Sequence, residues 1–227
     1  MTMNINKYLT PTEFIDSGNS TIIEYAEQFI GEEHDQGKQA IKLYYAVRDN
    51  IRYDPYRIRF TAIDLKASSI LNQGYGYCVT KALLLVALGR SVGIPSRLGF
   101  ADVRNHLSSE KLKQIMQSDI FFWHGYTEFY LNNKWVKSTP AFNKSLCDKA
   151  GIKPLEFDGR TDSIFHEFDQ AGNKHMEYIK VRGEFDDLPL REIILTYKKQ
   201  YPALAKAITQ SPEVVLEGSF ENDASSD

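Results

Sequence analysis

The sequence predicts an α+β fold, in which helices come first and one helix leads into a small antiparallel sheet. Two observations carry this prediction. The most apolar run, residues 78–88, has the length of a buried helix and follows two other helix-like segments. Beyond this run, residues 96–103, 120–131 and 135–139 have the composition and alternation of strands.

The first helices are predicted from apolar spacing and from end signals. Residues 19–33 form an apolar stripe, and Thr21 and Glu24 have the spacing of a capping box. Residues 36–50 form a second stripe, which Asp54-Pro55 interrupts. The buried helix at 78–88 follows a glycine-containing turn, and Gly93 and Pro95 mark its end.

The strands and the later elements follow from turn signals. Asn132-Asn133 predicts a hairpin between two strands, and Pro140 closes the second strand. A further hairpin is expected near 171–173, and a helix over 190–208 with a bend near Pro202. We expect one domain over 1–210, with a core at about 20–150 and a turn-rich extension with a C-terminal helix at 151–210. Residues 211–227 carry five acids and no base and are expected to form a disordered acidic tail.

Composition excludes several classes of function. The chain has 227 residues and a net charge of −3, so it has no basic surplus for binding nucleic acid. No apolar run is long enough to cross a membrane, and the first residues lack the pattern of a signal peptide, so a cytoplasmic protein is expected. Two cysteines are too few for a disulfide framework or a usual zinc site. No metal and no cofactor are expected, and the oligomeric state stays open.

Cys78 is the first candidate for chemistry. It begins the predicted buried helix, where free N–H groups and a partial positive charge lower the pKa of a thiol. The same N–H groups can stabilise an oxyanion. The alternative is a buried, inert cysteine that packs as a small apolar side chain.

His124 is the second candidate. Alternation along 120–131 places Phe122, His124, Tyr126 and Glu128 on one strand face, and Phe121, Trp123 and Thr127 on the other. A histidine held on a strand near the start of a helix can act as the general base and acid for a thiol. A structural role is the alternative, as is a metal site formed with Cys78, His106 and His166.

Other residues are candidates by position. Tyr53, Gln73 and Tyr75 are candidates for a second oxyanion donor, and ordinary packing is the alternative for each. Arg97 and Arg104 are candidates for binding a substrate carboxylate, and structural ion pairs are the alternative.

Several of these segments resemble the core of the transglutaminase-like superfamily of cysteine hydrolases and acyltransferases. The run GYGYCVTKALLLVALGRSVGIPSRLGFADV is followed by WHGYTEFYLNNKWVKSTPAF, with YYAVRDNIRYDP upstream. The resemblance covers about residues 38–143. It implies a papain-like α+β fold with Cys78 as the nucleophile, at the start of its helix, and His124 as the base.

The sequence departs from this family at the third catalytic position. The family usually has an aspartate immediately before the proline that ends the strand, and this chain has Thr139 there. With a two-residue turn at Asn132-Asn133, Thr139 shares the face of His124, whereas a three-residue turn places Ser138 there. Asn143, Asp158 and Asp162 are the alternative third members, and a Cys–His dyad is the remaining possibility.

The sequence therefore predicts a cysteine-dependent acyl-transfer enzyme. The preferred activity is that of a peptidase or amidase, which hydrolyses an amide through a thioester on Cys78. The alternatives are a transglutaminase-type or small-molecule acyltransferase, and a catalytically silent binding protein. The substrate is expected to be a peptide, a protein or a small amide, selected by residues 151–190.

Overall fold

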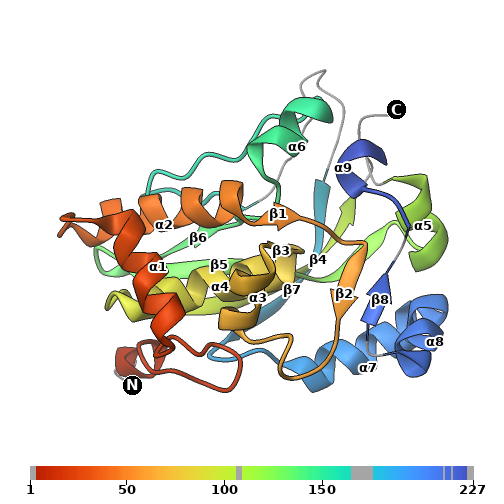
Figure 1. Ribbon diagram of the computed structural model, residues 1–227, viewed down its shortest axis with the longest axis horizontal. Helices are drawn as coiled ribbons and strands as arrows, with labels where there is room; N and C mark the ends of the chain where they lie inside the picture. Colours follow the sequence, from red (N-terminus) through yellow and green to blue (C-terminus); the bar gives the residue numbers. More distant parts are fainter. Residues whose placement is uncertain (1–3, 106–108, 165–175, 212, 216, 224–227) are drawn as a thin grey trace.

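The computed structural model describes residues 4–105, 109–164, 176–211, 213–215 and 217–223. A helical layer covers one face of a four-stranded sheet (Figure 1). The helix α4 (Cys78–Ser91) lies between the two and packs against α1 (Ser20–Ile30), α2 (Gln36–Asn50), α3 (Ala67–Gln73) and the sheet. Residues 78–90 are all buried, which explains why the run is apolar throughout rather than striped.

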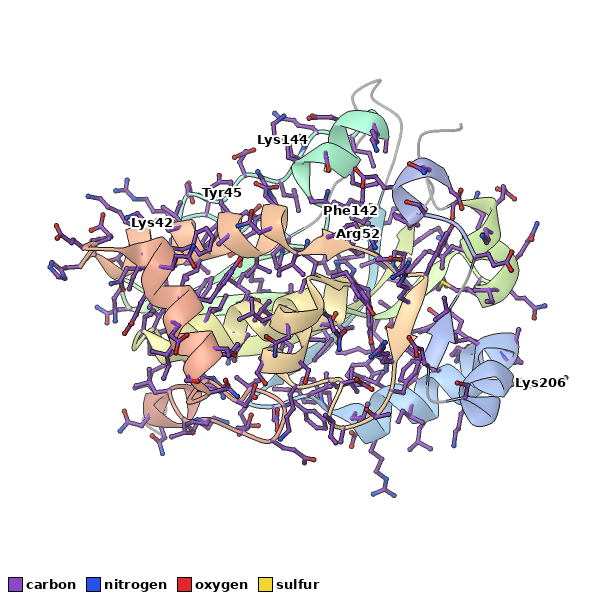
Figure 2. The ribbon with its side chains drawn as sticks, viewed as in Figure 1. Lys42, Tyr45, Arg52, Phe142, Lys144 and Lys206 are labelled. Atoms are coloured by element: carbon purple, nitrogen blue, oxygen red, sulfur yellow. The ribbon has the colours of Figure 1, made fainter. Side chains whose placement is uncertain are left out.

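Local signals set the ends of these helices. The Asn19 side chain accepts the Thr21 N–H, so Asn19 caps α1 rather than the expected box of Thr21 and Glu24. Gly31, at φ 57°, ends the helix. At the start of α4 the Thr80 hydroxyl accepts the Tyr77 N–H. Exposed lysines such as Lys42, Lys144 and Lys206 lie away from this buried centre (Figure 2).

The sheet is antiparallel, with the strand order β6-β5-β4-β7. Its strands are β4 (Ser96–Asn105), β5 (Ile120–Leu131), β6 (Lys134–Ser138) and β7 (Met176–Phe185). Leu131 pairs with Lys134, and Asn132 and Asn133 both have positive φ, so the predicted two-residue turn is confirmed. The hairpin expected near 171–173 lies outside the described residues.

A β-bulge interrupts β5 immediately before His124. Ala101 pairs with His124, but Val103 pairs with Phe121, so two residues of β5 oppose Asp102 alone. One of them, Trp123, has a φ of 61°, a conformation that a bulky side chain rarely adopts. The bulge therefore changes which way the first residues of β5 face.

Shorter elements complete the fold. They are η1 (Ile5–Tyr8), β1 (Arg52–Tyr53), β2 (Arg57–Arg59), β3 (Tyr75–Gly76), α5 (Glu110–Met116) and α6 (Lys144–Lys149). The predicted C-terminal helix is two helices, α7 (Leu190–Gln200) and α8 (Pro202–Gln210), which meet at Tyr201. None of the described helices is both long enough and apolar enough to cross a membrane.

The segment expected to form a disordered tail contains two described elements. The strand β8 (Glu213–Val215) pairs with β2, and α9 (Phe220–Asp223) follows it. Phe220 is buried against the rings of Tyr53 and Tyr56. Phe220 is an aromatic residue, which is a signal for burial, but the acidic composition of the whole segment concealed it.

Candidate active site

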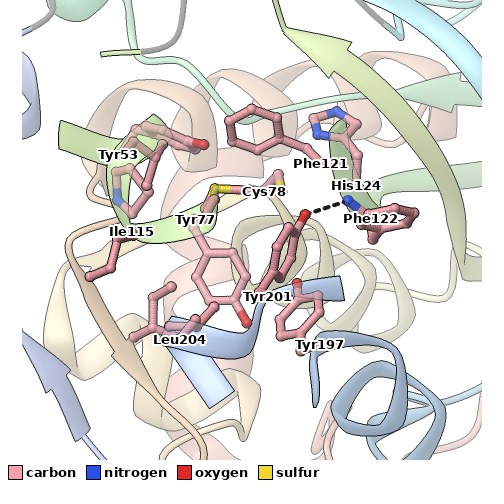
Figure 3. A pocket seen from close by; sticks show the side chains of 14 residues that line it. Tyr53, Tyr77, Cys78, Ile115, Phe121, Phe122, His124, Tyr197, Tyr201 and Leu204 are labelled. Atoms are coloured by element: carbon pink, nitrogen blue, oxygen red, sulfur yellow. Dashed lines mark hydrogen bonds between the residues drawn. The ribbon is translucent and has the colours of Figure 1, made fainter. Parts of the chain in front are cut away.

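Cys78 and His124, which lie far apart in the sequence, line the same pocket. Cys78 reaches it from the start of α4, and His124 reaches it from β5, just after the bulge. Figure 3 shows Cys78 among the lining side chains, with the His124 ring on one side and Tyr53 on the other. The pocket encloses about 610 Å³, solvent at its mouth included. Its lining is completed by Pro55, Ile58, Tyr77, Leu112, Ile115, Met116, Phe121, Phe122, Tyr197, Tyr201 and Leu204.

The environment of the Cys78 thiol differs from the one expected. Burial raises the pKa of Cys78 to about 11, although the backbone N–H groups of Gly125 and Val79 lower it. The sequence predicted a lowered pKa from the helix start alone. The side chain is only 8% exposed, and this loss of solvent outweighs the N–H groups. The thiol is therefore protonated at neutral pH in this conformation.

Gly125 allows β5 to approach the start of α4. A Cβ at this position would lie 2.8 Å from the Cα of Val79, which is closer than real Cβ atoms come to backbone. Because Gly125 follows His124 and Val79 follows Cys78, this approach brings the two candidates to one pocket. This glycine was not among the predicted site residues.

The position of His124 is set by contacts that its strand makes with neighbouring elements. It is buried, and it lies opposite Ala101 of β4. Before it, the Asp102 carboxylate accepts the Trp123 N–H at 3.1 Å, and the Trp123 indole donates to the Thr196 hydroxyl at 2.8 Å. These contacts fix the bulge and hence the position from which the imidazole enters the pocket.

Three tyrosines place hydroxyl groups at the pocket. Tyr53, a predicted candidate, lines it together with Tyr77 and Tyr197, which sequence analysis missed. Burial raises the pKa of each phenol, so all three stay protonated and can donate hydrogen bonds at neutral pH.

The other two candidates for an oxyanion donor lie elsewhere. Gln73 and Tyr75 line a separate, smaller pocket beside Arg57 and Thr80, and neither lines the pocket of Cys78. The Gln73 amide donates to the Asp64 carbonyl, and Arg57 lies over the Tyr75 ring. The structure therefore does not bring either candidate to the pocket of Cys78.

The candidates for a third member have different surroundings. Extending the β5–β6 register by one residue places Thr139 opposite Tyr126, on the face of His124. The Thr139 hydroxyl donates to the Ile164 carbonyl at 2.7 Å, so it can act only as an acceptor toward an imidazole. Ser138, the alternative that a three-residue turn favoured, pairs with Thr127 on the opposite face.

The alternative third members are engaged away from the pocket. Asn143 Oδ1 accepts the Tyr53 N–H at 3.1 Å, and its amide donates to Ser145. Asp158 caps its own turn, accepting the N–H groups of Arg160 and Thr161, and Asp162 accepts the Lys137 N–H. Both aspartates are exposed, and none of the three residues lines the pocket. Asn143 instead positions Tyr53.

The predicted arginine candidates form ion pairs. Arg97 pairs with buried Glu128 at 2.5 Å, and Arg104 pairs with Asp119 at 2.8 Å. Neither arginine lines the pocket. The described residues contain no cluster of ligands for a metal ion. His106 and His166, considered as metal ligands, lie outside the described residues, so that alternative stays untested.

The pocket walls do not come from the segment expected to select substrates. The expectation placed selection in residues 151–190, but no described residue of that segment lines the pocket. Its outer walls come instead from α5 and from the α7–α8 pair. The Tyr201 hydroxyl secures this pair, because it accepts the Phe122 N–H at 2.8 Å and donates to the Ile120 carbonyl at 2.7 Å.

Comparison with known proteins identifies the class. The transglutaminase-like superfamily core matches residues 23–140, just over half of the chain, so the protein belongs to the transglutaminase-like superfamily. This family membership confirms the resemblance on which the sequence analysis relied. The α+β architecture with a four-stranded antiparallel sheet is consistent with the fold of that family.

The chain is similar to a solved structure, whereas no curated protein matches the chain. The structure is described as "a Putative Cysteine Protease from Cytophaga hutchinsonii". The two share 16% sequence identity, with a TM-score of 0.45. The match covers 82% of this chain and 55% of the other, so this chain spans about half the length of that protein.

Proposed function

We propose that the protein is a cysteine-dependent acyl-transfer enzyme that hydrolyses an amide bond, as a peptidase or amidase does. One observation carries this proposal: Cys78, at the start of a buried helix, and His124, on a strand beside it, line the same pocket. Nucleophilic catalysis by a thiol requires a base near the sulfur, and a shared pocket supports this pairing. Membership of the transglutaminase-like superfamily supports the same reaction class.

The reaction begins with attack by the sulfur. As the Cys78 sulfur bonds to the substrate carbonyl carbon, His124 takes the thiol proton. The oxyanion lies at the N–H groups of the first turn of α4, with the Tyr53 hydroxyl as the second donor. The C–N bond then breaks, and His124 donates its proton to the leaving nitrogen.

Water completes the cycle. His124 removes a proton from water as the water oxygen attacks the thioester carbon. The C–S bond breaks, the acid leaves, and the proton on His124 returns to the sulfur. In the alternative reaction an amine takes the place of water and a new amide forms.

The raised pKa of Cys78 makes the base essential. With a pKa of about 11, the resting site holds a thiol and not a thiolate. Proton transfer must therefore accompany attack, which is the work of a general base. In this proposal the Thr139 hydroxyl orients the imidazole by accepting from it. A hydroxyl lacks the charge of the usual aspartate and stabilises imidazolium less.

Two observations favour a second candidate, a silent binding protein of this family. Thr139 replaces the usual aspartate, and Cys78 is buried with a raised pKa. Such a protein would bind a ligand in the pocket without forming a thioester.

The test is hydrolysis of a panel of acyl-aminomethylcoumarin amides, followed by fluorescence. We expect turnover by the wild type, with a loss of roughly 10³-fold or more in Cys78→Ala and in His124→Ala. Cys147→Ala is the matched control for the thiol, because Cys147 is buried in α6, away from the pocket. His34→Ala is the control for the imidazole.

Mass spectrometry of the intact protein distinguishes the candidates. A covalent acyl adduct on Cys78 that forms with the substrate and is then hydrolysed supports the hydrolase. Turnover that persists in Cys78→Ala would contradict it. Ligand binding without any adduct or turnover across the panel would favour the silent binding protein.

A further inference from the structure

We infer that the pocket at Cys78 selects substrates whose acyl group is an uncharged aryl or alkyl chain, and that α5 and the α7–α8 pair make this selection. The inference rests on the proposed function, because it names the substrate class of the same site. Its evidence is the chemistry of the pocket walls.

The walls contain no charged side chain. Among the described lining residues there is no carboxylate, no ammonium and no guanidinium group, and His124 is the sole basic group. Leu112 and Ile115 of α5 face the cavity together with Leu204 of α8. A charged acyl group would lose its water here without gaining an ion pair, which disfavours its binding. An aryl or alkyl group would gain free energy from the same burial.

The polar groups of the pocket fit a neutral carbonyl. The phenols of Tyr53, Tyr77 and Tyr197 remain protonated, because burial raises the pKa of each. They therefore offer hydrogen-bond donors but no fixed charge. An amide carbonyl attached to an apolar chain matches both features, because its oxygen accepts from a phenol while its chain contacts the walls.

Part of this wall lies beyond the segment that the family shares. Tyr197 and Leu204 follow residue 140, where the family match ends. Their helices are fixed to β5 through Thr196 and Tyr201, which bond Trp123 and the backbone of residues 120 and 122. The α7–α8 part of the selecting wall therefore lies outside the matched core, whereas α5 lies within it.

The experiment measures alkylation of Cys78 by three iodoacetyl reagents that differ only in their attached group. They are N-benzyl-iodoacetamide, iodoacetamide, and an iodoacetamide with a trimethylammonioethyl group. In each case the sulfur displaces iodide, and peptide mass spectrometry follows the product. Each rate is divided by the rate of the same reagent with glutathione. We expect the benzyl reagent to exceed the cationic reagent by at least about tenfold at Cys78.

A pair of variants tests the wall itself. Ile115→Lys introduces a cation at a half-buried lining position, and Gln114→Lys introduces the same charge at the exposed neighbouring position on α5. We expect Ile115→Lys to reduce the benzyl rate several-fold and to raise the normalised rate of iodoacetate, an anionic reagent. Gln114→Lys should leave both normalised rates unchanged. Circular dichroism checks that both variants are folded.

The outcomes separate the two proposals. Equal normalised rates for the benzyl and cationic reagents would overturn the inference and leave the proposed function standing. A Cys78 that resists every reagent in the folded protein, but reacts once the protein is unfolded, would contradict the proposed function and the inference with it. A benzyl preference that Ile115→Lys removes and Gln114→Lys retains would support the inference.

Discussion

The carboxylate of Asp102 accepts the backbone N–H of Trp123, at 3.1 Å, one residue before His124. The same oxygen accepts from Arg182 Nε at 2.5 Å. Asp102 thus joins three neighbouring strands at the point where β5 bulges, because Arg182 lies on β7. His124, the candidate base, is the next residue along β5 after this junction.

Replacing Asp102 should therefore affect both stability and the site. Asp102→Ala leaves the Arg182 guanidinium without its carboxylate and the bulge without its acceptor. We expect the free energy of unfolding to fall by about 3 kcal/mol, as for a broken buried ion pair. Urea unfolding measures this change. Amide hydrolysis should fall further than the folded fraction does, because His124 is displaced.

Asp119→Ala is the control for that variant. Asp119 pairs with Arg104 Nε at 2.8 Å on the surface, where exposed ion pairs contribute about 1 kcal/mol or less. Equal destabilisation by the two substitutions would show that the Asp102 junction has no special role.

Gly125→Ala should separate the two candidate residues. The added methyl group meets the Val79 Cα, which is backbone and cannot rotate away, so β5 and the first turn of α4 must move apart. We expect a destabilisation of about 1–3 kcal/mol and a loss of amide hydrolysis. Gly18→Ala is the control, because its Cβ would meet only Pro11 at an ordinary 3.5 Å. An active, fully stable Gly125→Ala protein would contradict this account.

The reactivity of Cys78 should depend steeply on pH. Folding raises the pKa of this thiol from about 8.5 to about 11, so the thiolate fraction increases roughly tenfold per pH unit up to that value. We expect the rate of iodoacetamide alkylation to climb from pH 7 to 10 without a plateau. A plateau below pH 8 would instead indicate a thiolate–imidazolium pair at rest.

The same raised pKa has a consequence for stability. The folded state holds the thiol proton more tightly than the unfolded state does, so this contribution is complete below about pH 8.5. It is lost as the pH rises toward about 11. Urea unfolding of Cys78→Ala should therefore show a weaker loss of stability over this alkaline range than the wild type shows.

Thr139→Val tests the proposed orienting hydroxyl. The substitution keeps the shape of the side chain but removes the acceptor proposed for His124. We expect kcat for amide hydrolysis to fall with little change in KM. Thr127→Val is the matched control, because it also loses a buried donation to a carbonyl, that of Ala82, on the other face of β5. Equal kinetic effects in both variants would assign Thr139 a purely structural role.

Phe220 links the C-terminal segment to the site. Its ring packs on Tyr53, which lines the pocket, and on Tyr56. We expect Phe220→Ala to lower the free energy of unfolding by about 3 kcal/mol. Val215→Ala, at an exposed position of β8, should change it by less than about 0.5 kcal/mol. A negligible effect at Phe220 would restore the interpretation of this segment as a loose tail.

The sequence predicted the elements that periodicity and turn chemistry control. The buried helix from Cys78 and the Asn132-Asn133 turn follow from local signals, and both are present. Alternation along β5 failed at its start. Phe121 was expected on the face of Thr127, opposite to that of His124, but it lines the same pocket as His124. A carboxylate on another strand holds this bulge, so the alternation of residues along β5 does not reveal it.

The remaining site features depend on tertiary contacts. Tyr197 reaches the pocket only because Tyr201 bonds the backbone of β5, a contact between distant segments. The pKa of Cys78 depends on its burial in the folded protein, which a helix-start argument does not include. These contacts explain why the candidate pair was predictable while its surroundings were not.

The strand order also determines when the site is completed during folding. The β4–β5 and β5–β6 pairs join segments close in the sequence, whereas β7 must return to β4 across a much longer loop. Closing a longer loop costs more chain entropy and slows assembly. Pulsed hydrogen exchange should therefore show amide protection in the β5–β6 hairpin before protection in β7. Arg182 arrives with β7, so the charge that pairs with Asp102 is added to a sheet that has already formed.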